Sequence, residues 1–131
     1  MAFSTMASLS KTPAAARPTL LALGAASLII GLLKTAKPEA IARNTGMAEA
    51  GMVRTLGLRE SAAGAGLLMA GPDAPWIAAH GLGLMGQIAI LLKARPTTAR
   101  QWRGLALGYG VVLGLTLADL YAARRLARAK A

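Results

Sequence analysis

The chain has 131 residues, of which 55% are hydrophobic and only 15% are charged, and its formal net charge is +10. Soluble domains usually carry about 25% charged residues, so this composition excludes an ordinary small soluble domain. With no cysteine and a single histidine, it also excludes disulfides, thiolate metal sites, covalently attached haem and histidine clusters, and no cofactor is predicted.

The first 17 residues form a polar lead-in that is rich in Ser, Thr, Ala and Pro. An uncharged block follows over residues 18–33, and its first residue is a proline, which suits the first turn of a helix. Sixteen helical residues rise about 24 Å, less than the roughly 30 Å of a hydrocarbon core. We therefore expect a first membrane span that is extended by snorkelling side chains of Arg17, Lys34 and Lys37.

The second helix is predicted to begin near Met47 and to end at Gly71-Pro72, with its apolar part over residues 56–70. A short interfacial helix over residues 37–41 precedes it, opened by a proline. The charged residues of the second helix lie in its first half, which places them close to one membrane face.

The third span is predicted over residues 76–92, after a tight turn at residues 71–75, and the fourth over residues 104–123. Short connections make consecutive spans antiparallel neighbours. The prediction is an all-α integral membrane domain over residues 18–126, a four-helix up-down-up-down bundle, followed by a basic tail at residues 127–131.

The aromatic and basic residues indicate how this bundle lies in the membrane. Trp76 and Tyr121 are expected at one interface and Trp102 at the other. The four spans place both termini on the same side, where six Lys and Arg residues are found, against nine in the other two connections. The positive-inside rule favours the connections inside. Basic residues that flank apolar blocks predict membrane lipids as partners, and not nucleic acid.

Gly81, Gly83 and Gly86 match the G-x-G-x-x-G pattern of dinucleotide-binding folds. That chemistry needs a strand-to-helix turn, whereas these glycines lie inside an apolar span. Close helix packing explains them better.

Small residues four apart form stripes on two of the predicted helices, and such stripes let helix backbones approach closely in lipid. The predicted helix-packing residues are Ala62, Gly66 and Ala70 on the second helix and Gly110, Gly114 and Ala118 on the fourth. The neighbour can be another helix of this chain or a partner.

Four polar residues are candidate structural pairs. Antiparallel order places His80 and Asp119 at a similar depth, where an imidazole–carboxylate hydrogen bond would stabilise both in lipid. A structural pair or a wetted interfacial histidine is the simpler interpretation, and contact of His80 with a haem or quinone is the alternative. Arg59 and Glu60 are expected near the opposite face, where Glu60 could pair with Arg103 or Lys93.

Residues 54–64, with the sequence RTLGLRESAAG, resemble the R-x-x-G-x-R-E-x-x-x-G element of a small bacterial membrane module. That module is related to DoxX-like proteins and occurs alone or ahead of cyclase/dehydrase domains. Trp76 after a proline and the late segment over residues 119–125 also fit, and the resemblance covers residues 18–126. It implies a four-helix bundle in the bacterial inner membrane. Two positions that are acidic in the relatives hold Leu84 and Gln87 here.

The sequence therefore predicts a non-catalytic accessory or scaffold subunit that packs against a larger membrane complex. The alternative is a free-standing transporter-like or quinone-associated protein that uses His80, Asp119, Arg59 and Glu60. An enzyme is not predicted, because the sequence suggests no nucleophile with a base, no metal set and no paired carboxylates.

Overall fold

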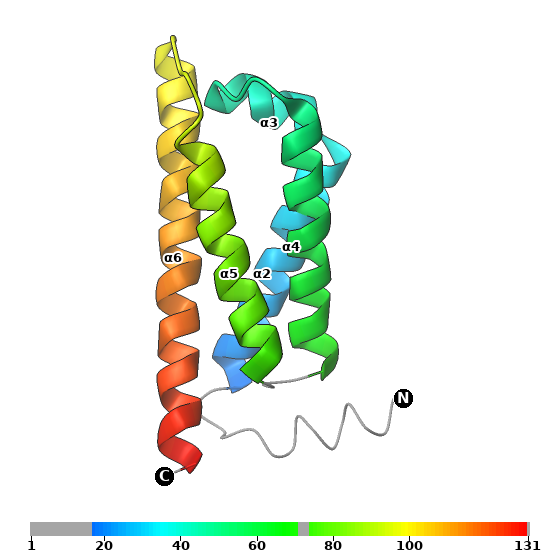
Figure 1. Ribbon diagram of the computed structural model, residues 1–131, viewed down its shortest axis with the longest axis vertical. Coiled ribbons are helices and arrows are strands. Elements are labelled where there is room, and N and C mark those ends of the chain that lie inside the picture. Colours follow the sequence, from blue (N-terminus) through cyan, green and yellow to red (C-terminus); the bar gives the residue numbers. More distant parts are fainter. Residues whose placement is uncertain (1–16, 71–73, 131) are drawn as a thin grey trace.

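The computed structural model describes residues 17–70 and 74–130, and in these it is entirely helical (Figure 1). The helices are α2 (Arg17–Ala36), α3 (Pro38–Thr45), α4 (Ala50–Ala70), α5 (Ala74–Leu91) and α6 (Ala99–Lys130). The predicted all-α class is confirmed. The four long helices alternate in direction, and α3 lies across the end at which α2 stops and α4 begins (Figure 1).

The helix boundaries follow the uncharged blocks of the sequence, with differences at the ends. The second helix begins at Ala50 rather than near Met47, and the short helix extends to Thr45. Helix α6 begins five residues before its predicted apolar block and continues to Lys130, so residues 127–130 are helical. The lead-in at residues 1–16 and most of the turn at residues 71–75 lie outside the described residues.

Helix α3 is held in place at both of its ends. Pro38 occupies the first turn, and Gly46 closes the helix with a left-handed backbone at φ 71°. A side chain at Gly46 would meet the backbone of Pro96, and the Gly46 carbonyl accepts a hydrogen bond from the Arg95 N–H at 2.9 Å. The end of α3 is therefore fixed to the connection between α5 and α6, as well as to the helices on either side of it.

Helices α2 and α4 approach each other closely because glycines face each other at two levels. A Cβ atom at Gly64 would lie 2.6 Å from the Leu28 nitrogen, and one at Gly57 would lie 2.7 Å from the Gly31 carbonyl oxygen. On the α2 side of this contact, a Cβ atom at Gly24 would lie 3.1 Å from the Gly64 carbonyl oxygen. Only hydrogen fits at these positions, so these glycines fix the spacing of the pair.

The predicted small-residue stripes are used differently. Ala62 is exposed, Gly66 is buried, and the side chain of Ala70 lies outside the described residues. Gly110 and Gly114 are exposed, and a Cβ atom at either would meet no atom of the described chain within 4 Å. Ala118 is half-buried against the core. The close contact between α2 and α4 is therefore made by glycines that were not among the predicted packing residues.

A small apolar core lies between the four long helices, formed by Leu23, Leu67, Leu84, Val112 and Leu115. Most other large apolar side chains point outward. Each long helix has large apolar residues that are more than half exposed, for example Ile29, Leu58, Met85 and Leu113. The exterior is thus apolar on all four of them.

Candidate functional site

Three polar side chains from three helices form a buried hydrogen-bonded chain. His80 Nδ1 of α5 lies 2.7 Å from Asp119 Oδ2 of α6, and His80 Nε2 lies 2.5 Å from the Ser27 hydroxyl of α2. Ser27 has no exposed surface, and His80 and Asp119 are 3% and 6% exposed. The structure thus brings His80 and Asp119 together, and it adds Ser27.

The roles of the imidazole nitrogens follow from the carboxylate. An ionised carboxylate can only accept hydrogen bonds, so Nδ1–H donates to Asp119 and, in the neutral ring, Nε2 accepts from the Ser27 hydroxyl. This is the order of groups in a serine–histidine–aspartate triad. The sequence suggested no serine beside a histidine, and the structure places the Ser27 hydroxyl in hydrogen-bond contact with His80. Because Ser27 is completely buried, no substrate carbonyl can reach its oxygen in this arrangement.

A second polar cluster lies closer to the α3 end. The Lys34 ammonium of α2 donates to Glu60 Oε2 of α4 and to Gln87 Oε1 of α5, both at 2.6 Å. The expected partners of Glu60, Arg103 and Lys93, do not form this ion pair. Lys34 was expected to snorkel outward, but its side chain is only 17% exposed and turns inward. The Lys34 ammonium thus pairs with a buried carboxylate of α4.

Arg59 does not join this cluster, although it is adjacent to Glu60 in sequence. It is exposed, and its guanidinium group lies over α5 at two glycines. A Cβ atom at Gly86 would be 3.5 Å from Arg59 Nη1, and one at Gly83 would be 3.9 Å from Arg59 Cζ. Two glycines of the G-x-G-x-x-G pattern therefore accommodate an arginine within a helix, and no strand precedes them among the described residues.

A cavity of about 10 Å³ lies between the two polar clusters, lined by Arg59, Glu60, His80 and Gln87 together with apolar side chains. Its volume is roughly what one water molecule needs. Three buried polar atoms have no hydrogen-bond partner among the described residues: Glu60 Oε1, Ser61 Oγ and Asp119 Oδ1. The bundle interior therefore has more hydrogen-bond acceptors than the described side chains satisfy.

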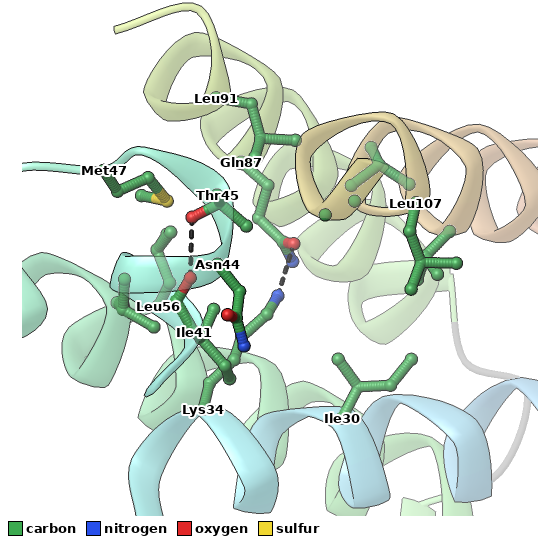
Figure 2. A pocket seen from close by; sticks show the side chains of 15 residues that line it. Ile30, Lys34, Ile41, Asn44, Thr45, Met47, Leu56, Gln87, Leu91 and Leu107 are labelled. Atoms are coloured by element: carbon green, nitrogen blue, oxygen red, sulfur yellow. Dashed lines mark hydrogen bonds between the residues drawn. The ribbon is translucent and has the colours of Figure 1, made fainter. Parts of the chain in front are cut away.

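A larger cavity of about 300 Å³ opens at the α3 end of the molecule. Figure 2 shows Lys34, Asn44 and Gln87 around its interior, with Ile30, Ile41 and Leu107 among the apolar side chains that form the rest of the wall. Its volume is at the lower limit of small-molecule sites. The cavity shares Lys34 and Gln87 with the polar cluster, so the buried ion pair forms part of its wall.

The predicted interface anchors lie near opposite ends of α6. Trp102 is 61% exposed close to the α3 end, and Tyr121 is 43% exposed in the other half of the helix. The Tyr121 hydroxyl accepts a hydrogen bond from Arg125 Nε at 3.1 Å, and the guanidinium lies 5.2 Å from the ring centroid. Trp76 belongs to α5, but its side chain lies outside the described residues.

Sequence reasoning missed Ser27, Lys34 and Gln87 as members of the two clusters. A signal for two of them was present: Ser27 is the only polar side chain between residues 20 and 33, and Gln87 is the only amide in the third apolar block. An isolated polar residue in an apolar span needs an internal partner. Lys34 gave no such signal, because a lysine at the end of a span ordinarily points to the interface.

Comparisons with protein-family models, curated proteins and solved structures give no match for this chain.

Proposed function

We propose that this chain is an integral membrane protein, an up-down-up-down bundle in which α2, α4, α5 and α6 cross the bilayer, and that it serves as a non-catalytic accessory subunit of a larger membrane assembly. The proposal has two parts, location and role, and each is supported by a different observation.

Length and hydropathy support the location. Two helices of the described chain are long and apolar enough to cross a membrane, residues 18–36 and 99–128, with mean hydropathies of 1.8 and 1.6. In the apolar 18-residue stretch of each helix, only 28% of the residues are buried, whereas the core helix of a soluble protein would be mostly buried. Residues 78–91 form a shorter apolar helix beside them. Lipid is the surrounding that covers such exposed apolar helices.

The distribution of polarity supports the same location. The buried side chains include Ser27, Glu60, His80, Gln87 and Asp119, while leucines, isoleucines and methionines cover the outside. In water both the buried polar groups and the apolar exterior are unfavourable, and an exposed apolar surface of this extent is rare in soluble monomers. In a bilayer the apolar exterior is solvated and the polar groups satisfy one another inside.

Aromatic spacing fits a bilayer as well. Trp102 and Tyr121 are nineteen residues apart on α6. A straight helix covers about 28 Å over that length, close to the thickness of a hydrocarbon core. Both rings are then at the depth of the two interfaces, as in an aromatic belt. The resemblance of residues 54–64 to the DoxX-like module leads us to propose the bacterial inner membrane, with both termini on one side.

One observation carries the proposed role. Gly110 and Gly114 are exposed on α6, and no atom of the described chain lies within 4 Å of a Cβ built at either. Small residues on a membrane helix allow close backbone contact with a neighbour. Because Gly110 and Gly114 make no such contact with the described residues, we assign this face to another membrane subunit.

The test is co-purification in a mild detergent. Changing Gly110 and Gly114 together to leucine should reduce the recovery of a larger membrane protein in fixed ratio by about tenfold, since van der Waals fit drives association in lipid. Ala89→Leu makes the same kind of change at an exposed position of α5 and should leave recovery unchanged. An unaltered yield of partner from the double variant would contradict the proposed role.

The buried Ser27–His80–Asp119 chain favours a second candidate, a free-standing transporter-like or quinone-associated protein. Under this candidate, His80→Ala abolishes transport or redox activity of the isolated protein in liposomes, while the Gly110 and Gly114 changes have no effect. Under the accessory role, the Gly110 and Gly114 changes reduce partner recovery, whereas His80→Ala lowers the stability of the fold without removing the contact face for the partner.

A further inference from the structure

We propose that the cavity at the α3 end binds one acyl chain of an anionic phospholipid, whose phosphate group is held by the exposed arginines beside the cavity. The inference rests on the membrane location proposed above, and it adds a specific lipid site that the accessory role does not require.

The shape and lining of the cavity fit an acyl chain. Its volume is about 300 Å³, and its walls come from all five described helices. Most of the lining is aliphatic, including Ile30, Leu56, Leu91 and Val111. Apolar walls of this kind favour a hydrocarbon occupant over a water-filled space.

The polar part of the cavity wall fits the ester end of an acyl chain. Lys34 Nζ has three N–H donors, of which one contacts Glu60 and one contacts Gln87. Among the described residues no acceptor is assigned to the third, and Lys34 lines the cavity together with Asn44. Since Glu60 balances the charge of Lys34, this position suits an uncharged acceptor such as the ester carbonyl of a lipid rather than a second carboxylate.

The place of the cavity along the bundle matches the depth of that carbonyl. Helix α3 covers this end of the molecule (Figure 1), and its residues Ile41, Asn44 and Thr45 line the cavity. A proline-initiated, amphipathic helix at the end of the spans belongs at the level of the lipid headgroups. A cavity directly beneath it lies where glycerol esters meet hydrocarbon.

Charge complementarity selects an anionic lipid. Two cavity residues, Asn44 and Gly104, directly follow the exposed residues Arg43 and Arg103 in the sequence. The α3 and α6 backbones touch here, because a Cβ atom at Gly104 would collide with the Asn44 carbonyl oxygen. The exposed acids at this end are Glu39 and Glu49, and they are outnumbered by the exposed basic residues Lys37, Arg43, Arg54, Lys93, Arg95, Arg100 and Arg103. A phosphate there gains charge-assisted hydrogen bonds, and a net negative headgroup gains more than a zwitterionic one.

The experiment uses the full chain in nanodiscs, with native mass spectrometry to count lipids retained after extraction. We expect one phosphatidylglycerol molecule to be retained in preference to phosphatidylcholine. Arg43→Gln with Arg103→Gln should weaken that retention by roughly 25-fold, from about fivefold for each of the two surface charges. The matched control, Arg124→Gln with Arg128→Gln, removes two exposed charges at the other end and should change nothing.

A second pair of variants tests the cavity itself. Val111→Trp fills the cavity and should abolish retention, whereas Leu113→Trp adds the same ring on the exposed face of α6 and should not. If Val111→Trp lowers helix content by circular dichroism, the surface arginine pair decides the question. Three results would overturn the inference. The first is equal retention of phosphatidylglycerol and phosphatidylcholine, and the second is equal retention of free glycerol phosphate and intact phosphatidylglycerol. The third is equal retention of phosphatidylglycerol by the wild type and by the Arg43→Gln, Arg103→Gln variant.

The experiments distinguish a wrong membrane location from a wrong lipid site. A chain that remains soluble and monodisperse without detergent defeats that proposal, whereas an inserted chain without a selectively retained lipid defeats only the lipid site. Loss of partner recovery in the Gly110 and Gly114 double variant bears on neither.

Discussion

Asp119 and Glu60 are buried carboxylates whose stability depends on single neighbours. Asp119 Oδ2 accepts from His80, and Glu60 Oε2 accepts from Lys34, while the second oxygen of each has no partner among the described residues. Removing the neighbour of a buried charge is more damaging than removing both members, since the charge then loses its counter-ion or its hydrogen-bond donor.

Replacing His80 by alanine should therefore destabilise the fold more than its size suggests. We expect a loss of about 3 kcal/mol in the free energy of unfolding, because the Asp119 carboxylate and the Ser27 hydroxyl both lose their partner. Unfolding by sodium dodecyl sulfate in mixed micelles, followed by circular dichroism, measures the change. A loss below about 0.5 kcal/mol would mean that the contacts make no net contribution.

The Lys34–Glu60 ion pair gives a test by comparison of single and double variants. Lys34→Met should destabilise the fold by about 3 kcal/mol, because it leaves Glu60 buried without a cation. Lys34→Met combined with Glu60→Gln should recover most of that loss, since an amide no longer needs a counter-charge. The same unfolding titration applies. If the double variant is less stable than Lys34→Met alone, Glu60 has another cation.

The sequence predicts these contacts only in part, and the reason is geometric. Antiparallel order sets depth, and depth alone brings His80 and Asp119 to one level, where the structure places them 2.7 Å apart. The direction of a side chain around its helix depends on how far each helix is rotated. That rotation is set by the glycine contacts of α2 and α4, so Ser27 and Lys34 could not be assigned from spacing.

At the scale of the element, the helices themselves were predictable because uncharged blocks and proline or glycine boundaries coincide. Pro38 and Gly46 delimit α3, and the positively charged connection before residue 99 separates α5 from α6. Less predictable was the length of α6. Its last turns carry Arg124, Arg125 and Arg128, whose charges indicate the end of an apolar block but do not interrupt a helix.

The α2–α4 contact predicts a position-specific effect of adding a side chain. Gly57→Leu should destabilise the bundle by more than about 2 kcal/mol, because its Cβ alone would lie 2.6 Å from Lys34 Cβ and the helices would have to separate. Gly51→Leu, in the same helix, meets no atom within 4 Å and should be neutral or slightly stabilising. The comparison uses the same micelle titration. Equal stability of the two variants would show that the close approach is not required.

At the scale of the whole molecule, the four-span proposal makes a prediction about sidedness. The chain contains no cysteine, so a single introduced thiol reports the side on which it lies. Ala48→Cys and Ala99→Cys, both at exposed positions of the α3 end, should react with an impermeant maleimide from one side of sealed vesicles. Ala127→Cys should react only from the other. The excess of Lys and Arg predicts the cytoplasm for the first two.

The labelling pattern separates the possible outcomes. If Ala127→Cys reacts from the same side as Ala99→Cys, α6 does not cross the bilayer. Reaction of Ala48→Cys and Ala99→Cys from opposite sides would mean that only one of α4 and α5 crosses.

The glycine-packed pair also has a consequence for the way the protein is made. All residues of that contact lie between Gly24 and Leu68, so α2 and α4 can associate while the ribosome is still synthesising the second half of the chain. The Ser27–His80–Asp119 chain spans residues 27 to 119 and can close only when α6 has entered the bundle. The order of these contacts along the chain therefore allows stepwise assembly, in which α2 and α4 pack first and His80 gains Asp119 only when α6 is in place.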